Sequence, residues 1–187
     1  AGAGVQWLRD RMKFFKKAYE TEKIIKSLED NKEVYLVPAF TGLGAPHWDA
    51  NARGVLSGIT RDTSPKEIIR ATIEAVAYQT HDLFEAMKHD GLRPKIVKVD
   101  GGMVMNNWFS QFLSDIVNVR VLRPKVQETT ALGAAFMAGL QIGVYKSLKD
   151  ISKKWQLDKK FNPKMKNSTR QSLIKGWNKA IKRALII

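Results

Sequence analysis

Residues 95–122 read KIVKVDGGMVMNNWFSQFLSDIVNVRVL, and this stretch decides the fold class. Apolar and polar residues alternate in 95–99, which is typical of a strand. Apolar positions spaced by three and four residues over 108–116 predict a helix, and 119–122 predict a second strand that ends at Pro124. A strand, a helix and a second strand in this order indicate an α/β fold with a parallel section of sheet.

Short elements are expected before this stretch. Apolar spacing predicts amphipathic helix over 4–29, either as one helix or as two. Residues 34–37 and 54–59 are predicted to be short strands, and the glycine-rich segment 41–49 between them is predicted to be a turn.

The clearest helix start in the chain lies at Ser64. Serine caps helices well, Pro65 fits the first helical position, and Glu67 stands three residues after the cap, so the three residues form a capping box. Gly91 and Pro94 are expected to end this helix.

Two further helices are expected in the last third of the chain. Thr129 and Thr130 are expected to cap a helix of small residues, and small side chains allow a helix to approach its neighbours closely. An amphipathic helix is predicted at the C-terminal end, with Trp177 and Ile181 on its apolar side. The lysine-rich sequence that continues past Gly143 to around 162–163 is expected to be a connection.

The composition is that of a folded protein. The chain has 187 residues, of which 44% are hydrophobic, so it can bury a core. It contains no cysteine, which excludes disulfides, zinc–cysteine sites and thiol catalysis and agrees with the cytoplasmic location that we expect. No apolar run approaches the roughly 20 residues of a membrane span, and the first residues lack the pattern of a signal peptide. The chain begins at Ala1 rather than at methionine, so we expect it to be a fragment.

The positive charge is concentrated at one end. The net charge is +14, and residues 143–187 hold 11 Lys and 2 Arg against only Asp150 and Asp158. Such a tail suits either a solvated surface or an anionic partner. We favour the solvated surface and expect no nucleic-acid partner; the alternative is a module that binds nucleic acid or an acidic membrane. Burial of Trp177 and Ile181 would argue against the membrane version.

The strongest candidate for a binding site is the segment 100–106, which reads DGGMVMN. Paired glycines after a strand leave the backbone open to a flat ligand, and the amides at the start of the following helix favour a phosphate. Asn106 is placed to hydrogen-bond a base or a ribose. The alternative is a tight loop that merely connects a strand to a helix.

Other possible sites are weaker. The glycine-rich residues 41–44 lack the lysine and the spacing of a phosphate-binding Walker loop. His47 beside Asp49 is more simply a surface residue than half of an acid–base pair. His81, Glu85 and His89 share one helical face, but ordinary charged faces look the same, so we expect no metal site there. We expect no catalytic residue in this chain.

Residues 34–49, VYLVPAFTGLGAPHWD, resemble the signature region of glycerol kinases in the FGGY family of carbohydrate kinases. The resemblance covers roughly residues 1–145 and fades in the tail. Further segments carry it in the same order: Ala52-Arg53-Gly54, Ile69-Arg70-Ala71-Thr72, Ala77-Tyr78-Gln79-Thr80, Val99-Asp100-Gly101-Gly102 and Thr130-Ala131-Leu132-Gly133-Ala134-Ala135.

This resemblance implies an actin-like, ribonuclease H-like ATPase domain, incomplete at its N-terminal side and followed by a basic helical C-terminal tail. The expected division is 1–145 for the domain and 146–187 for the tail. The resemblance also implies transfer of the γ-phosphate of ATP to glycerol, with Mg²⁺. It assigns contacts with ATP or ADP to four residues of this chain: Gly2, Gln6, Gly102 and Asn106.

The resemblance further implies what this chain lacks. The catalytic aspartate, the glycerol contacts and the phosphate loops of the family lie upstream of the matched segment. We therefore expect the isolated chain to be inactive, to meet glycerol only through the missing part, and to form a homo-oligomer when full length. A free strand edge would invite a partner. His47 stands where the family commonly has tyrosine, and the tail departs from the family pattern.

Overall fold

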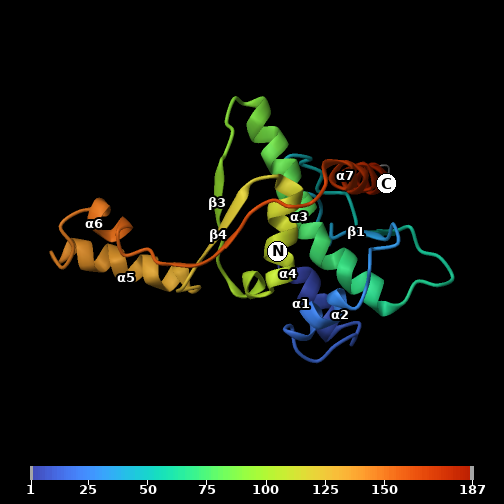
Figure 1. The fold of residues 1–187 in the computed structure, drawn as a ribbon, viewed down its shortest axis with the longest axis horizontal. Helices are drawn as coiled ribbons and strands as arrows, with labels where there is room; N and C mark the ends of the chain where they lie inside the picture. Colours follow the sequence, from blue (N-terminus) through green and yellow to red (C-terminus); the bar gives the residue numbers. More distant parts are fainter. Residues whose placement is uncertain (1, 186–187) are drawn as a thin grey trace.

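A long central helix and a small three-stranded sheet organise the structure, a computed structural model that describes residues 2–185 (Figure 1). The elements in chain order are α1 (Ala3–Asp10), α2 (Glu20–Lys26), β1 (Tyr35–Val37), β2 (Val55–Ser57), α3 (Pro65–His89), β3 (Ile96–Lys98), the 3-10 helix η1 (Gly102–Met105), α4 (Asn107–Val117), β4 (Arg120–Pro124), α5 (Thr129–Gln141), α6 (Leu148–Ser152), β5 (Leu157–Phe161) and α7 (Asn167–Ala184).

The sheet has the strand order β3-β4-β5. Strands β3 and β4 run parallel, with Val97 opposite Val121, and α4 connects them. Strand β5 pairs antiparallel with β4, so that Phe161 also lies opposite Val121. Strands β1 and β2 form a separate antiparallel pair. The α/β architecture with a parallel section is therefore confirmed, whereas β5 and α6 occupy sequence that we expected to be a connection.

Helix α3 is the centre of the core and begins as predicted. The backbone N–H of Ser64 donates to the Glu67 carboxylate at 2.9 Å, and Ser64 Oγ accepts from the backbone N–H of Lys66. The helix packs against α4, β1 and α2 and buries Ile69 and Tyr78. The helical stretch expected over 4–29 forms as two helices, α1 and α2, the first of which begins at Ala3.

The C-terminal helix α7 is part of the same core. Trp177 is fully buried, stacks on Tyr78 with ring centroids 5.3 Å apart, and donates from Nε1 to Asp82 Oδ2 at 2.8 Å. Ile181 is buried as well, and α7 packs on β1 and β2. Its apolar face is therefore covered, which argues against membrane binding through this helix. The division of the chain at residue 145 stays a prediction.

Helices α5 and α6 form an arm, residues 129–152, that projects away from the rest of the molecule (Figure 1). Within α5 only Gly139 is buried; a Cβ there would lie 2.7 Å from Cε2 of Tyr145, so the close packing that we expected for the small residues occurs at this one position. The expected capping by Thr129 and Thr130 is also wrong, because Glu128 is the N-cap and Thr129 donates its hydroxyl to Asp100 instead.

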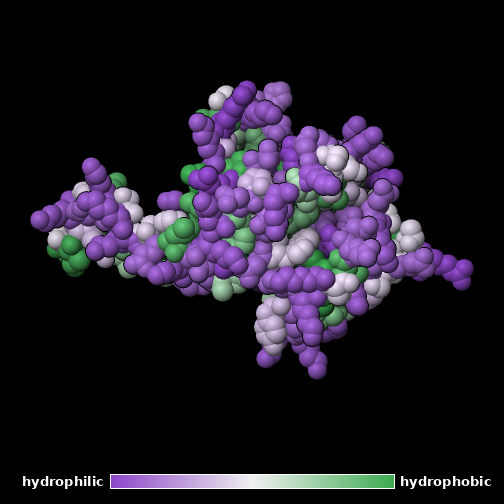
Figure 2. Space-filling view, viewed as in Figure 1, coloured by the Kyte–Doolittle hydropathy of each residue, from purple (hydrophilic) through white to green (hydrophobic). Residues whose placement is uncertain are grey.

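The surface of the arm is partly hydrophobic, as Figure 2 shows beside the mostly hydrophilic body. Its exposed apolar side chains are those of Met137, Ile142, Val144 and Leu148.

Among residues 2–185, no helix combines the length and the apolar character needed to cross a membrane.

Candidate functional site

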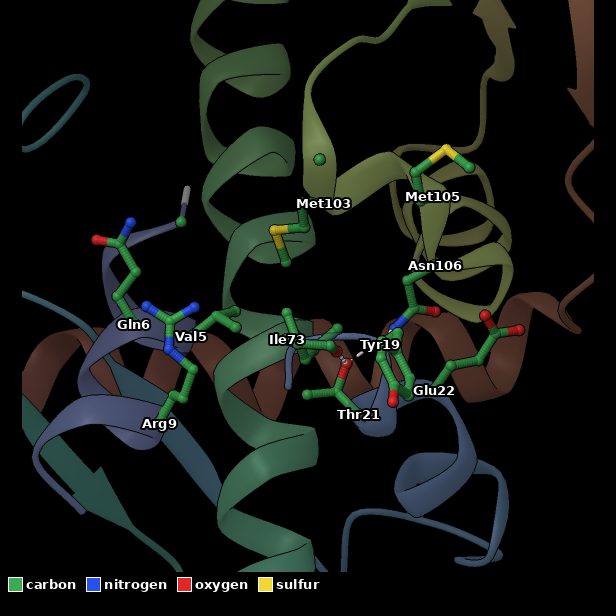
Figure 3. A pocket seen from close by; sticks show the side chains of 13 residues that line it. Val5, Gln6, Arg9, Tyr19, Thr21, Glu22, Ile73, Met103, Met105 and Asn106 are labelled. Carbon is green, nitrogen blue, oxygen red and sulfur yellow. Dashed lines mark hydrogen bonds between the residues drawn. The ribbon is translucent and has the colours of Figure 1, made fainter. Parts of the chain in front are cut away.

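The four residues expected to contact a nucleotide line one pocket, although they come from opposite halves of the sequence. The pocket has a volume of about 370 Å³ and lies between α1, α2, α3 and η1 (Figure 3). Volumes of this size suit small-molecule ligands. The four residues are Gly2, Gln6, Gly102 and Asn106.

Helix α1 supplies the first half of this set. Gly2 is its N-cap and Gln6 lies one turn later, so both occupy the same side of the helix. Gly4 allows the helix to approach α3, because a Cβ at this position would lie 2.7 Å from Cγ2 of Thr72. The close packing of α1 on α3 thus fixes where Gly2 and Gln6 face the pocket.

The turn after β3 supplies the second half. Gly101 has a φ of +81°, a conformation that side chains disfavour, so glycine is required there by the backbone. Gly102 is different, because a Cβ added to it would meet nothing within 4 Å. Glycine at position 102 is not needed for packing, and it leaves the pocket wall open to a ligand, as expected from the sequence.

The start of α4 differs from our expectation. Asn106 Oδ1 accepts a hydrogen bond from the backbone N–H of Phe109 at 2.9 Å, and Glu22 Oε2 accepts one from the N–H of Asn107 at 3.2 Å. Side chains therefore occupy the amides of Asn107 and Phe109, so these two amides are not free for a phosphate. Phosphate binding by the turn and the helix start stays a prediction.

The walls of the pocket are mainly apolar, and its charges lie at separate ends. Val5, Ile73 and Met103 line the middle. Figure 3 shows Gln6 and Arg9 on one side and Glu22 beside Asn106 on the other.

Glu22 is ionised at neutral pH. Burial acts to raise the pKa of its carboxyl, but the hydrogen bonds from Lys26 and from the backbone of Asn107 outweigh burial and lower that pKa. The side of the pocket nearest Asn106 therefore holds a carboxylate that is paired with Lys26 at 2.6 Å. Arg9 at the opposite side is paired with Asp10 at 2.7 Å.

Sequence reasoning missed several residues of this pocket. Its other lining residues include Arg9, Tyr19, Thr21, Glu22, Ile73, Met103 and Met105. Thr21 and Glu22 belong to the first turn of a short helix and meet their partners 85 residues away, so no local pattern marks them.

The weaker candidates have structural roles. His47 Nε2 lies 3.3 Å from Asp82 Oδ2, whereas Asp49 accepts two backbone N–H groups in its own turn. Gly42 has a φ of +95° and no room for a Cβ against residues 49–50, as a tight turn requires. In the part of the chain that the structure describes, no group of three or more His, Cys, Asp or Glu is placed to hold a metal ion.

Comparison with known proteins identifies the family. Residues 1–142 match the model of the C-terminal domain of the FGGY family of carbohydrate kinases. The chain belongs to the FGGY family. Its relatives include glycerol kinase 1 of Pseudomonas aeruginosa, 54% identical over 183 residues, and a glycerol kinase of Clostridium botulinum, 52% identical over 185 residues. Each match covers 98% of this FGGY chain, which spans 37% of the length of these relatives.

Solved structures of FGGY kinases share the fold of this chain. The glycerol kinase of Plasmodium falciparum, solved with ADP, superposes with a TM-score of 0.87 at 36% identity, covering 100% of this chain and 37% of that protein. A ligand-bound xylulose kinase of Lactobacillus acidophilus gives a TM-score of 0.82 at 27% identity, covering 99% of this chain and 38% of that protein. The actin-like fold class expected from the sequence is confirmed.

Proposed function

We propose that this FGGY chain is the nucleotide-binding part of a glycerol kinase, which transfers the γ-phosphate of ATP to glycerol and forms glycerol 3-phosphate. The observation that carries the proposal is the convergence of Gly2, Gln6, Gly102 and Asn106 on one pocket. The relative solved with ADP and the glycerol kinases that are 51–54% identical over nearly the whole chain support it.

In this proposal the pocket holds the adenosine part of the nucleotide. The apolar side chains of Val5, Ile73 and Met103 cover the faces of the base and exclude water from it. Gly102 lets the ligand approach the backbone, and the amides of Asn106 and Gln6 supply polar contacts that fix its orientation.

The chain supplies binding and orientation rather than chemical catalysis. Phosphoryl transfer depends on aligning the nucleotide with the acceptor and on stabilising the charge that develops. Among the described residues no group of three or more His, Cys, Asp or Glu is placed to hold a metal ion, so we assign no residue to Mg²⁺ and derive no step through the ion. We propose that glycerol meets this chain only through the part of a full-length kinase that it does not cover, and that the isolated chain is inactive. A cytoplasmic location and a homo-oligomeric full-length kinase belong to the same proposal.

Calorimetric titration of the purified chain with ADP tests the nucleotide site. The titration is run at low and high salt, with adenosine as an uncharged ligand. We expect binding that persists at high salt, extends to adenosine and is lost in Gly102→Val. Gly133→Val is the matched control, because a Cβ at either glycine meets nothing within 4 Å and Gly133 lies outside the pocket.

The opposite pattern would reject the nucleotide site. Binding that disappears in salt and is the same in Gly102→Val would assign the attraction to the basic tail instead. Glycerol-dependent production of ADP by the chain alone, above a blank, would contradict its proposed inactivity. No observation favours a nucleic-acid or membrane module as a second function.

A further inference from the structure

The hydroxyl group of Thr21 connects α2 to the proposed nucleotide site. Thr21 is only 3% exposed, and its Oγ1 donates to the backbone carbonyl of Ala18 at 2.7 Å. A hydroxyl has one hydrogen, so Oγ1 can only accept from its second neighbour, Asn106 Nδ2, which lies 3.4 Å away.

The same orientation of the Asn106 amide follows from its other contact. Oδ1 of Asn106 accepts from the backbone N–H of Phe109, so the carbonyl oxygen faces α4 and the nitrogen faces Thr21 and the pocket. An amide nitrogen carries two hydrogens. One of them is directed to Thr21, and the second is available to a ligand.

Glu22 fixes the backbone next to this amide. Its Oε2 accepts from the N–H of Asn107, and its Oε1 accepts from Lys26 Nζ at 2.6 Å. Two successive residues of α2 thus hold two successive residues at the start of α4. Because Glu22 occupies the N–H of Asn107, that amide is closed to a phosphate, so the base of a nucleotide belongs here and the phosphates belong toward Gly2 and Gly102.

We infer that Thr21 and Glu22 are positioning residues, which hold Asn106 so that it presents an N–H donor to an acceptor nitrogen of the base. This inference rests on the proposed nucleotide-binding function. It states that α2 orients Asn106, the side chain that contacts the base. A donor that is already oriented loses little conformational freedom on binding, so the constraint strengthens the contact. Thr21→Val removes the acceptor but keeps the shape of the side chain, which leaves the Asn106 amide held only through its oxygen by the N–H of Phe109.

The test is calorimetric titration of the full chain with ADP and with its 1-deaza, 3-deaza and 7-deaza analogues, each lacking one ring nitrogen. We expect the original chain to bind one of these analogues about 5- to 10-fold more weakly than ADP, which identifies the acceptor. In Thr21→Val we expect ADP to bind about 2- to 10-fold more weakly than it binds the original chain. We also expect this variant to bind ADP and that analogue with nearly equal affinity. Thr21→Ser, which keeps the hydroxyl, should restore both values.

A matched control is Thr80→Val. Thr80 Oγ1 also donates to a backbone carbonyl at 2.7 Å, that of Val76, and lies outside the pocket, so this variant should bind ADP normally. Glu22→Gln keeps an acceptor for Asn107 and should weaken ADP binding less than Thr21→Val does.

The outcomes separate the two proposals. If the original chain fails to bind ADP, the proposed function falls and the inference with it. If the original chain binds ADP but shows no deaza penalty, or if Thr21→Val behaves like the original chain toward every analogue, only the positioning role is overturned.

Discussion

Glu67 is the residue at which pH should act most clearly on stability. Burial acts to raise the pKa of its carboxyl, but the hydrogen bonds from Ser64 and Lys32 outweigh burial and lower that pKa to about 2. Because the folded-state pKa lies below the usual value of 4.5, the stabilisation is present above pH 4.5 and is lost as pH falls toward 2. Linkage allows ionised Glu67 to contribute roughly 3 kcal/mol to the free energy of unfolding. Because its partner Lys32 is half exposed, we expect a contribution of about 2 kcal/mol.

Urea unfolding of the original chain and of Glu67→Gln between pH 6 and pH 3 measures this effect. The original chain should be the more stable at pH 6, and the difference between the two free energies of unfolding should narrow as pH falls. A difference that is the same at every pH would show that Glu67 acts through shape or hydrogen bonding rather than through its charge.

Glu74 should have a larger effect on stability, because it is fully buried among polar partners. Its carboxylate accepts from Arg70, Asn31 and Tyr78, each within 3.1 Å. Glu74→Ala would leave the Arg70 guanidinium, only 11% exposed, without its charged partner. Removing one member of a buried ion pair costs about 3–5 kcal/mol, and we expect a loss of that size in chemical denaturation. Glu85→Ala, which breaks an exposed pair with Lys88, is the comparison and should cost less than about 1 kcal/mol. Equal losses would contradict the role of burial.

Single residues differ in how far the sequence reveals their roles. The capping box of Ser64 and Glu67 was predictable, since both partners lie within four residues of each other. Gly102 and Asn106, which line the pocket, could be predicted as candidates because the turn after a strand is a local pattern. Thr21 was not found, because its partner Asn106 is brought to it only by tertiary packing.

Among the elements, α7 depends on a close approach to β1. Gly176 faces Tyr35, and a Cβ on Gly176 would overlap the Tyr35 hydroxyl oxygen and ring. Tyr35 is buried, so it has little room to move. We expect Gly176→Ala to lower the free energy of unfolding by about 1–3 kcal/mol, as overpacking usually does.

The control for this variant lies on another helix. Gly133 is inside α5, where a Cβ meets nothing within 4 Å, so Gly133→Ala should be neutral or stabilise the chain by up to about 1 kcal/mol through helix propensity. Thermal and urea unfolding of both variants distinguish packing from propensity. A gain in stability for Gly176→Ala would mean that α7 does not pack on Tyr35.

The elements that the sequence predicted well are those with long amphipathic patterns. Helices α3 and α4 carry regular apolar spacing and bury it, so pattern and packing agree. Strand β5 escaped prediction because four of its five residues are exposed, which leaves a lysine-rich segment without alternation. Helix α5 was predicted as a helix, but its surroundings were not, since small residues indicate close packing without identifying a partner.

At the scale of the whole molecule, stability should be uneven between the core and the arm formed by residues 129–152. Helices α3 and α4 pack against each other and bury most of their apolar side chains, whereas the arm buries one glycine of α5 and nothing of α6. Segments with little burial open locally at low free-energy cost. We expect hydrogen–deuterium exchange to label the arm at least about tenfold faster than α3.

ADP should slow hydrogen–deuterium exchange only around the pocket. Ligand binding stabilises the states that bind it, so amides of η1 and of the first turn of α2, which line the pocket, should exchange more slowly at saturating ADP. The arm lies outside the pocket, and its exchange should be the same with and without the nucleotide. Gly102→Val should abolish the protection at η1 without altering exchange in α3, because a Cβ at that position meets no other part of the chain. Protection that spread to the arm would show that the nucleotide couples the arm to the core, and arm exchange as slow as that of α3 would contradict its isolation in this fold.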